Sequence, residues 1–589
     1  MFKLLKYADK YKFYAFISPL LMIGEVIFEL LIPQVMADIV ETIRLTETTD
    51  PAIQQQAINT IFILGAKMLG LAVCSLLCGA SAAIVASVAG MGFGSTLRGA
   101  LVSRVQTFSF SNIDRFSTAS LITRMTTDVN TVQNTFLMLI RGIFRAPIML
   151  ISALVICISK SKQVSSVFAV SLPIIVIVLA IAGPVAIKRF RAMLKMFDGF
   201  NASIQENLTN IRVVKTFVRT DYEKKKFKKA NDELMGAALH AEKLIILGEP
   251  ALMLIMSLTI LAVVIIATKA IAEETLVVGE FTAIFTYIMQ IIMSFLFTIV
   301  MVAQLFMSEA SAKRIGEVLN EEADITDPEN ADTNVNDGSI EFKNVSFAYG
   351  KGKNILKNVS FKIESGEMVG IMGATGSSKS SLVQLIPRLY DTNEGDVFVG
   401  GKNVKSYHLQ SLRDAVSMVL QKNVLFSGTI ADNLRWGDEN ATDEEIREAC
   451  AVADADSFVM SFPDGYNTDL GQGGVNVSGG QKQRLCIARA ILKKPKILIL
   501  DDSTSAVDTA TDARIRAGLR KSIPDTTKII IAQRVSSVSD CDKIIILDNG
   551  EINDIGTHEE LLERNEIYKD IYTAQQKGSG DFDEQGGEL

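Results

Sequence analysis

Residues 368–386 read MVGIMGATGSSKSSLVQLI, an apolar run followed by a loop of small residues and the start of a second apolar segment. The first run predicts a buried strand, and the segment after the loop predicts a helix. Gly373, Lys379 and Ser380 fit the phosphate-binding pattern G-x-x-x-x-G-K-[ST]. In such a loop backbone N–H groups surround phosphates, the lysine meets the β- and γ-phosphates, and the hydroxyl ligates Mg²⁺. Ser378 stands where the pattern has glycine, and its side chain is expected to crowd the loop and lower ATP affinity.

Two further motifs follow this loop along the chain. Residues 496–508, KILILDDSTSAVD, form an apolar strand pattern that ends in two carboxylates, and Asp501 is the expected Mg²⁺-associated aspartate. VSGGQKQR (477–484) lies between the loop and that strand, directly before the helical segment CIARAILKK. This ordered set resembles the ATPase domain of ABC transporters. With the apolar N-terminal half, the whole chain resembles a half-transporter of the multidrug-exporter group.

The resemblance implies an ATP site with Mg²⁺. Tyr349 would stack on adenine, although by its position alone it also fits a core aromatic at a strand end. Residues 505–508 match the D-loop, and 478–481 would bind the nucleotide held by a partner's phosphate-binding loop. Gln421 would sense Mg²⁺ and contact the membrane domain. The expected nucleotide-binding residues are Tyr349, Gly373, Gly376, Ser377, Ser378, Lys379, Ser380, Ser381, Gln421, Ser478, Gly479, Gly480 and Gln481, with Ser380, Gln421 and Asp501 at the metal.

Two residues depart from the family where hydrolysis occurs. Asp502 takes the position of the general-base glutamate, and its shorter side chain should place the carboxylate ~1–1.5 Å short of the attacking water. Gln533 replaces the switch histidine; it can hydrogen-bond a γ-phosphate but carries no positive charge. Drift in a working site would explain Asp502 alone. Together the two residues resemble the degenerate ATP site in one subunit of heterodimeric bacterial ABC exporters.

The first 320 residues contain six long apolar stretches, at about 13–42, 59–106, 120–158, 163–210, 235–270 and 279–318. Because ~20 apolar residues cross a bilayer, we predict six transmembrane helices whose ends extend beyond the membrane. Lysines and arginines gather at the N-terminus and in the two long even-numbered connections, which places that face in the cytoplasm. The resemblance puts coupling helices in these connections, near 111–116 and 219–227. Solvated connecting helices would show the same pattern.

Glu25 and Glu29 lie one turn apart inside the first apolar stretch. A carboxylate at membrane depth is costly and faces a cavity, a partner or water. Two roles fit these glutamates: attraction of a cationic cargo, or pairing that holds the helix bundle together. Arg141 and Arg145 are expected near the inner interface, where long basic side chains reach the headgroups.

We therefore predict an α-helical membrane domain of six transmembrane helices with long cytoplasmic extensions (1–320), a linker (321–337), an α/β P-loop ABC ATPase domain (338–576) and a disordered tail (577–589). The predicted function is ATP-driven export of amphipathic, drug-like or cationic substrates, with a second half-transporter as partner. The expected location is the bacterial plasma membrane, with the N-terminus and the ATPase domain cytoplasmic. An ATP-gated regulator or channel and a slow homodimeric exporter share the same motifs. The net charge of -7 gives no basic surface for a nucleic acid.

Overall fold

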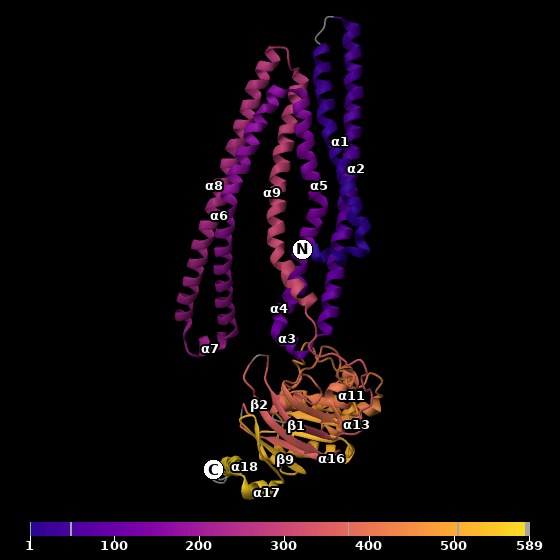
Figure 1. Cartoon of the computed structure of the whole chain (residues 1–589), viewed down its shortest axis with the longest axis vertical. Coiled ribbons are helices and arrows are strands. Elements are labelled where there is room, and N and C mark those ends of the chain that lie inside the picture. Colours follow the sequence, from indigo (N-terminus) through magenta and orange to yellow (C-terminus); the bar gives the residue numbers. More distant parts are fainter. Residues whose placement is uncertain (1, 47–49, 351, 375, 504–505, 584–589) are drawn as a thin grey trace. The chain divides into compact units, whose positions relative to one another are not determined.

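The computed structural model describes residues 2–46, 50–350, 352–374, 376–503 and 506–583 (Figure 1). The chain divides into two compact units. The first contains Met1–Arg104 and Ile122–Asn320, and the second contains Val105–Leu121 and Glu321–Leu589. Residues 105–121, in the connection after the second long helix, therefore belong to the unit that carries the nucleotide motifs.

Six long apolar helices build the first unit. They are α1 (Lys12–Leu45, preceded by the 3₁₀-helix η1, Phe2–Tyr11), α2 (Pro51–Gln106), α5 (Val129–Lys160), α6 (Lys162–Thr209), α8 (Thr220–Ala272) and α9 (Val278–Asn320). With the short helices that extend them, the six spans are 43 to 56 residues long. At ~1.5 Å per residue each exceeds the ~30 Å thickness of a hydrocarbon core. The predicted extension of these helices beyond a membrane follows directly.

The helices of this unit pack in pairs. α5 lies along α9, and α6 lies along α8 (Figure 1). A buried cluster joins α1, α5 and α9 through side chains such as Val26, Ala153 and Ile288. By contrast, large apolar residues in the middle of α2, such as Leu69 and Leu76, are exposed. Exposure of this kind suits contact with lipid rather than water.

Short helices interrupt the two long connections, the one after α2 and the one after α6. The first carries α3 (Phe110–Phe116), α4 (Thr118–Thr123) and a π-helical turn, η2 (Arg124–Asp128). The second carries α7 (Ile211–Thr216), so the placement of a short helix at 219–227 was wrong: Thr220 already begins the long helix α8. The break falls at Val218, whose φ of 53° is left-handed and cannot continue a right-handed helix.

Two sheets organise the second unit. One has the order β2-β1-β4-β5 and antiparallel pairing, and the other has the order β10-β9-β3-β8-β7-β6. In the second sheet β3, β6, β7, β8 and β9 are parallel and β10 is antiparallel to β9. The strands are β1 (Ile340–Phe347), β2 (Leu356–Ile363), β3 (Met368–Met372), β4 (Glu394–Val399), β5 (Lys402–Asn403), β6 (Val416–Val419), β7 (Ile497–Asp501), β8 (Thr527–Ile531), β9 (Lys543–Asp548) and β10 (Glu551–Gly556). β3, β7 and β8 are buried along their whole length, as their continuous apolar runs predict.

Helices and 3₁₀ turns surround these sheets. They are α10 (Lys379–Gln384), η3 (Val404–Ser406), α11 (Leu409–Ala415), α12 (Ile430–Leu434), α13 (Asp443–Val452), α14 (Asp456–Val459), η4 (Gly465–Asn467), α15 (Gly479–Leu492), α16 (Thr509–Ser522), η5 (Val535–Ser537), α17 (His558–Arg564) and α18 (Glu566–Asp583). The predicted fold class, a six-helix membrane domain fused to an α/β ATPase domain, is confirmed. Helix α18 includes residues 577–583, which the sequence had placed in a disordered tail. Residues 584–589 of that tail lie outside the described residues.

Candidate functional site

The predicted nucleotide motifs meet at one edge of the larger sheet. Because β3, β7 and β8 are parallel, their carboxyl ends lie at the same edge, and ligands of open α/β sheets bind there. A cavity of about 310 Å³ opens at this edge. Its lining residues are Gly376, Ser378, Lys379, Ser380, Ser381, Gln421, Asp501, Asp502, Ile531 and Gln533.

Of the three residues predicted at the metal, Ser380 and Asp501 lie in contact, whereas Gln421 bonds to Asp502. The Ser380 hydroxyl donates to Asp501 Oδ1 at 2.9 Å. Burial raises the pKa of the Asp501 carboxyl and the negative charge of Asp502 adds to this rise, while the Ser380 hydrogen bond and Lys379 oppose it. A buried carboxylate whose negative charge lacks a full counter-charge is a suitable ligand for a small divalent cation. Ser380 and Asp501 therefore fit Mg²⁺.

Lys379 begins α10 and turns back over the loop. Its Nζ donates to the carbonyl oxygens of Gly373 and Ala374 at 2.8 and 2.9 Å, and to Ser377 Oγ at 3.3 Å. Burial lowers the pKa of this ammonium group, although Asp502 and Asp501 favour its charge. A half-buried ammonium group bonded mainly to neutral carbonyls is well placed to exchange them for phosphate oxygens.

Backbone geometry explains why the loop pattern calls for glycine at position 378. Ser378 has φ 72° and ψ 23°, the left-handed conformation that side chains other than glycine adopt at a cost of roughly 1–2 kcal/mol. Gly373 meets a different constraint, because a Cβ there would lie 2.1 Å from the carbonyl oxygen of Leu547. Lack of space therefore requires glycine at position 373, whereas the backbone conformation is what favours glycine at position 378.

Asp502 is tied to both glutamines of the site. Its Oδ2 accepts a hydrogen bond from Gln533 Nε2 at 3.0 Å and another from Gln421 Nε2 at 3.4 Å. Asp502 also has a left-handed backbone, with φ 50°, which aspartate tolerates better than most residues. The hydrolysis positions predicted from the sequence, Asp502 and Gln533, are therefore direct neighbours.

Tyr349 lies beside the phosphate-binding helix. Its hydroxyl lies 3.0 Å from Ser381 Oγ and donates to Gln384 Oε1 at 3.2 Å. The ring is exposed and meets Tyr390 edge-on, with centroids 5.1 Å apart. An exposed ring next to the phosphate-binding loop suits stacking on a base better than a role in the core.

Tyr390 lies beside the candidate site but was not among the residues predicted from the sequence. Its hydroxyl donates to Asp114 of α3 at 2.7 Å, and its ring meets Phe110 of the same helix at 6.0 Å. Burial and the hydrogen bond to Asp114 both raise the pKa of the Tyr390 hydroxyl. The predicted coupling helix at 111–116 thus packs beside the aromatic residue expected to hold adenine. No spacing in the sequence relates Tyr390 to Tyr349, so this contact depends on the fold.

The signature residues form the start of α15 instead of lining this cavity. Ser478 caps the helix: its Oγ accepts from Gln481 N at 3.3 Å, and Gln481 Oε1 accepts from Ser478 N at 2.8 Å. Among the described lining residues of the cavity, none belongs to 478–481. A Cβ on Gly480 would lie 2.9 Å from the carbonyl oxygen of Ala506, so the signature packs against the D-loop. Ser505, the first predicted D-loop residue, lies outside the described residues.

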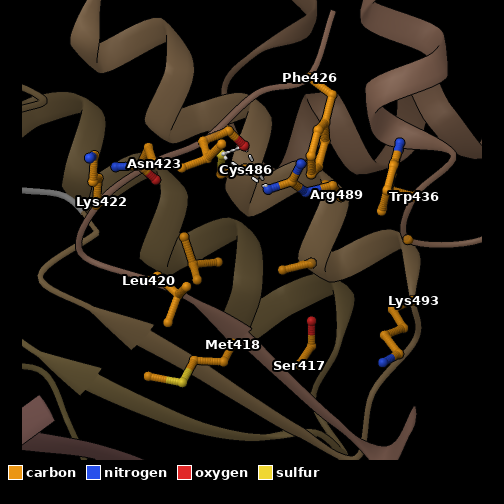
Figure 2. A pocket seen from close by; sticks show the side chains of 14 residues that line it. Ser417, Met418, Leu420, Lys422, Asn423, Phe426, Trp436, Cys486, Arg489 and Lys493 are labelled. Atoms are coloured by element: carbon orange, nitrogen blue, oxygen red, sulfur yellow. Dashed lines mark hydrogen bonds between the residues drawn. The ribbon is translucent and has the colours of Figure 1, made fainter. Parts of the chain in front are cut away.

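A second hollow lies on the same unit, lined by residues of β6, the segment that follows it, and α15 (Figure 2). Trp436, 66% exposed, stacks on Phe426 with ring centroids 4.3 Å apart. Leu420 and Val424 are exposed beside them. Arg489 donates from Nη2 to the Val424 carbonyl at 3.1 Å and so fixes one wall. An exposed aromatic and aliphatic hollow is typical of a surface that another protein segment covers.

An ion cluster lies within the helices of the first unit. Arg145 of α5 contacts Glu29 at 2.9 Å and Glu25 at 3.4 Å, both on α1. Of the two roles open to these glutamates, the contacts favour pairing, with Arg145 as the shared partner. Arg141 is exposed on α5. Two carboxylates share one guanidinium, so the cluster has an excess of negative charge if all three groups are ionised.

Six membrane-length helices joined to a P-loop ATPase domain define an ATP-dependent membrane transporter. The family model for the ABC transporter transmembrane region matches residues 15–295, and the ABC transporter model matches residues 356–505. The chain is 37% identical over 582 residues, 98% of both chains, to the uncharacterized ABC transporter ATP-binding protein YfiB of Bacillus subtilis. It is 34% identical to the putative multidrug export ATP-binding/permease protein YgaD of the same species, over 81% of this chain and 83% of the relative.

A solved structure agrees with this assignment. The structure of a bacterial Atm1-family ABC exporter with ATP bound matches 96% of this chain and 98% of its own, with a TM-score of 0.80 and 25% identity. The chain belongs to the ABC transporter family and has the half-transporter arrangement of an exporter. An ABC ATPase domain implies ATP binding and hydrolysis by the transporter.

Proposed function

We propose that this chain is one subunit of a heterodimeric ABC exporter. Its own site binds ATP and Mg²⁺ but hydrolyses ATP slowly, and residues 478–481 complete the catalytic site on the partner subunit. The observation that carries the proposal is Asp502, a shortened general base whose Oδ2 accepts hydrogen bonds from Gln533 and Gln421.

The case for ATP binding comes from the phosphate-binding loop. Ser380 and Asp501 would hold Mg²⁺, and Lys379 would release its loop carbonyls to bind the β- and γ-phosphates. Tyr349 would receive the adenine from its exposed position beside Ser381. When bound, ATP with Mg²⁺ supplies the phosphoanhydride bond and the charge that these residues are arranged to hold.

The case for slow hydrolysis comes from the distance between the Asp502 carboxylate and the attacking water. Aspartate is one methylene shorter than glutamate, and a misplacement of ~1 Å can cost about a hundredfold in rate. The hydrogen bonds from the two glutamines also restrain the Asp502 carboxylate in its position. Gln533 would keep a polar contact to the γ-phosphate without adding positive charge to the transition state.

The case for a partner comes from surfaces that one chain leaves open. The signature residues lie apart from this chain's own cavity, and the hollow beside Trp436 exposes apolar side chains. We assign that hollow to a coupling helix of the partner half-transporter. In return, Phe217 and Val218, exposed 71% and 84% at the α7–α8 connection, would enter the partner's equivalent hollow.

The cargo follows from charge and from the relatives. YgaD is described as a putative multidrug export protein, and on that basis we propose amphipathic or drug-like cargo for this chain. The excess negative charge of the cluster of Glu25, Glu29 and Arg145 is compatible with cationic members of that class. The lysines and arginines of the N-terminus and the even-numbered connections support our proposal that the ATPase domain is cytoplasmic in a bacterial cell.

Purification of the chain alone and together with a second half-transporter tests the proposal. We expect slow ATP hydrolysis by the chain alone, and fast hydrolysis with transport into vesicles by the pair. Brisk turnover and transport by the chain alone would identify a homodimeric exporter instead. Nucleotide-dependent gating by the pair without vesicle transport would identify a regulator or channel.

A further inference from the structure

A glutamine on the C-terminal helix contacts the loop that carries Gln533. We call residues 533–535, which follow β8 and include the first residue of η5, the switch loop. Gln575 of α18 donates from Nε2 to the carbonyl oxygen of Gln533 at 2.7 Å. Its Oε1 accepts a hydrogen bond from Val535 N at 2.8 Å. One side-chain amide therefore holds the backbone on both sides of Arg534.

The part of α18 before Gln575 packs on the domain core, which holds Gln575 in place. Tyr568 is fully buried in the core, and its hydroxyl lies 2.7 Å from His558 Nδ1. Ile571 and Tyr572 pack against the same core. The spacing of Tyr568, Ile571, Tyr572 and Gln575 is that of one helix face, so Gln575 continues the packed face to the point where it meets the switch loop.

The switch loop is held on its other side as well. Arg534 donates from Nη1 to the carbonyl oxygen of Val507, a predicted D-loop residue, at 3.2 Å. Gln533 then directs its own side chain onto Asp502. Rotation of the Gln533 backbone by a small angle would displace its amide group, because that group extends three bonds beyond Cα. Its position therefore depends on the bonds that fix the loop.

We propose that Gln575 is a positioning residue for the switch glutamine, and that helix α18 thereby sets how well this site distinguishes ATP from ADP. The inference rests on the proposed role of Gln533 at the γ-phosphate. Removal of the Gln575 amide frees the Gln533 carbonyl and the Val535 amide to bond to water. The Gln533 side chain is then no longer held in position for the γ-phosphate, while the contacts of the site with the α- and β-phosphates and with adenine stay unchanged.

The chain offers a matched control in the next residue. Gln576 donates to the Tyr572 hydroxyl at 2.7 Å, a contact within α18 itself. Gln575→Ala and Gln576→Ala make the same chemical change in adjacent exposed positions of one helix. An effect on helix stability or folding would appear in both variants, and an effect on the switch loop would appear only in the first.

The experiment measures ATP and ADP affinities of the full-length chain in lipid nanodiscs, by displacement of a trinitrophenyl-ADP reporter in EDTA, where hydrolysis is blocked. We expect the unsubstituted chain to prefer ATP. Gln575→Ala should lower that preference about three- to tenfold, the equivalent of one well-aimed hydrogen bond, with ADP affinity unchanged. Gln576→Ala should keep the preference, and Gln575→Ala should add nothing in a Gln533→Ala background.

Each other result overturns the inference in a recognisable way. An unchanged preference in Gln575→Ala overturns it and leaves the proposed function intact. Equal losses in Gln575→Ala and Gln576→Ala, or a further loss in the Gln533→Ala background, assign the effect to general helix stability. Absence of ATP preference in the unsubstituted chain overturns both this inference and the proposed role of Gln533.

Discussion

Substitution of Ser378 by glycine should stabilise the ATP-binding unit, because it removes a strained backbone. The left-handed conformation of Ser378, with φ 72°, costs a residue with a side chain roughly 1–2 kcal/mol, and glycine adopts it freely. Glycine also gives the unfolded chain more conformational freedom, which lowers the free energy of unfolding by about 0.4–1 kcal/mol. The net expectation is about 0.5–1 kcal/mol of added stability, or a rise of about 1–4 °C in the unfolding midpoint of a domain of this size.

The assay is thermal unfolding of the full-length chain in detergent, with the transition of the ATP-binding unit followed separately. Ser378→Ala is the matched control, since alanine loses the hydroxyl group but keeps a Cβ in the left-handed conformation. We expect no gain from alanine. Ser378 also lines the nucleotide cavity, so glycine should raise ATP affinity as well. A gain from alanine equal to that from glycine would refute the assignment of the cost to backbone strain.

Three further outcomes are expected. Asp502→Glu with Gln533→His should raise ATP turnover at this site about ten- to a hundredfold, with a smaller rise from Asp502→Glu alone; no rise in the double variant would contradict the role given to these residues. Because burial raises the pKa of Asp501, protons should compete with Mg²⁺ at higher pH than at an exposed aspartate. The ratio of ATP affinities with Mg²⁺ and with EDTA, corrected for protonation of ATP itself, should therefore fall already in weakly acidic buffer, and a ratio constant to about pH 4 would contradict this. Arg145→Ala removes the cation that two carboxylates share and should lower the stability of the membrane unit in nanodiscs by about 1–3 kcal/mol, with a smaller loss from Glu29→Gln; equal losses would argue against charge as the cause.

Most of the nucleotide site was predictable because its parts are local. The phosphate-binding loop lies within a dozen residues, and the strand before Asp501 is a continuous apolar run, so pattern alone predicts each of them. Their meeting at one sheet edge is a property of the fold. The apolar stretches likewise predicted the six long helices, since length and hydropathy decide membrane insertion. The sequence predicted crowding at Ser378 but not backbone strain, because the composition of the loop does not reveal its backbone conformation.

The features that the sequence did not reveal depend on contacts between distant segments. Tyr390 meets α3 through Asp114, and Gln575 meets the switch loop, although each residue is ordinary for its helix or loop. Arg145 pairs with glutamates more than a hundred residues away, and only helix packing brings them together. The wrong placement of a short helix at 219–227 has a local cause. Val218 has a left-handed backbone, which β-branched residues rarely adopt and which no sequence pattern signals.

The fate of ATP bound at this chain's own site tests the central claim most directly. The purified full-length chain, without a partner, is mixed with radiolabelled ATP and Mg²⁺, separated from free nucleotide at successive times, and its bound nucleotide is identified. Binding through Lys379, Ser380 and Asp501, with a base at Asp502 that is one methylene too short, predicts that the bound nucleotide is recovered as ATP over many minutes. Rapid recovery as ADP, at the rate of a competent ABC ATPase, would contradict it.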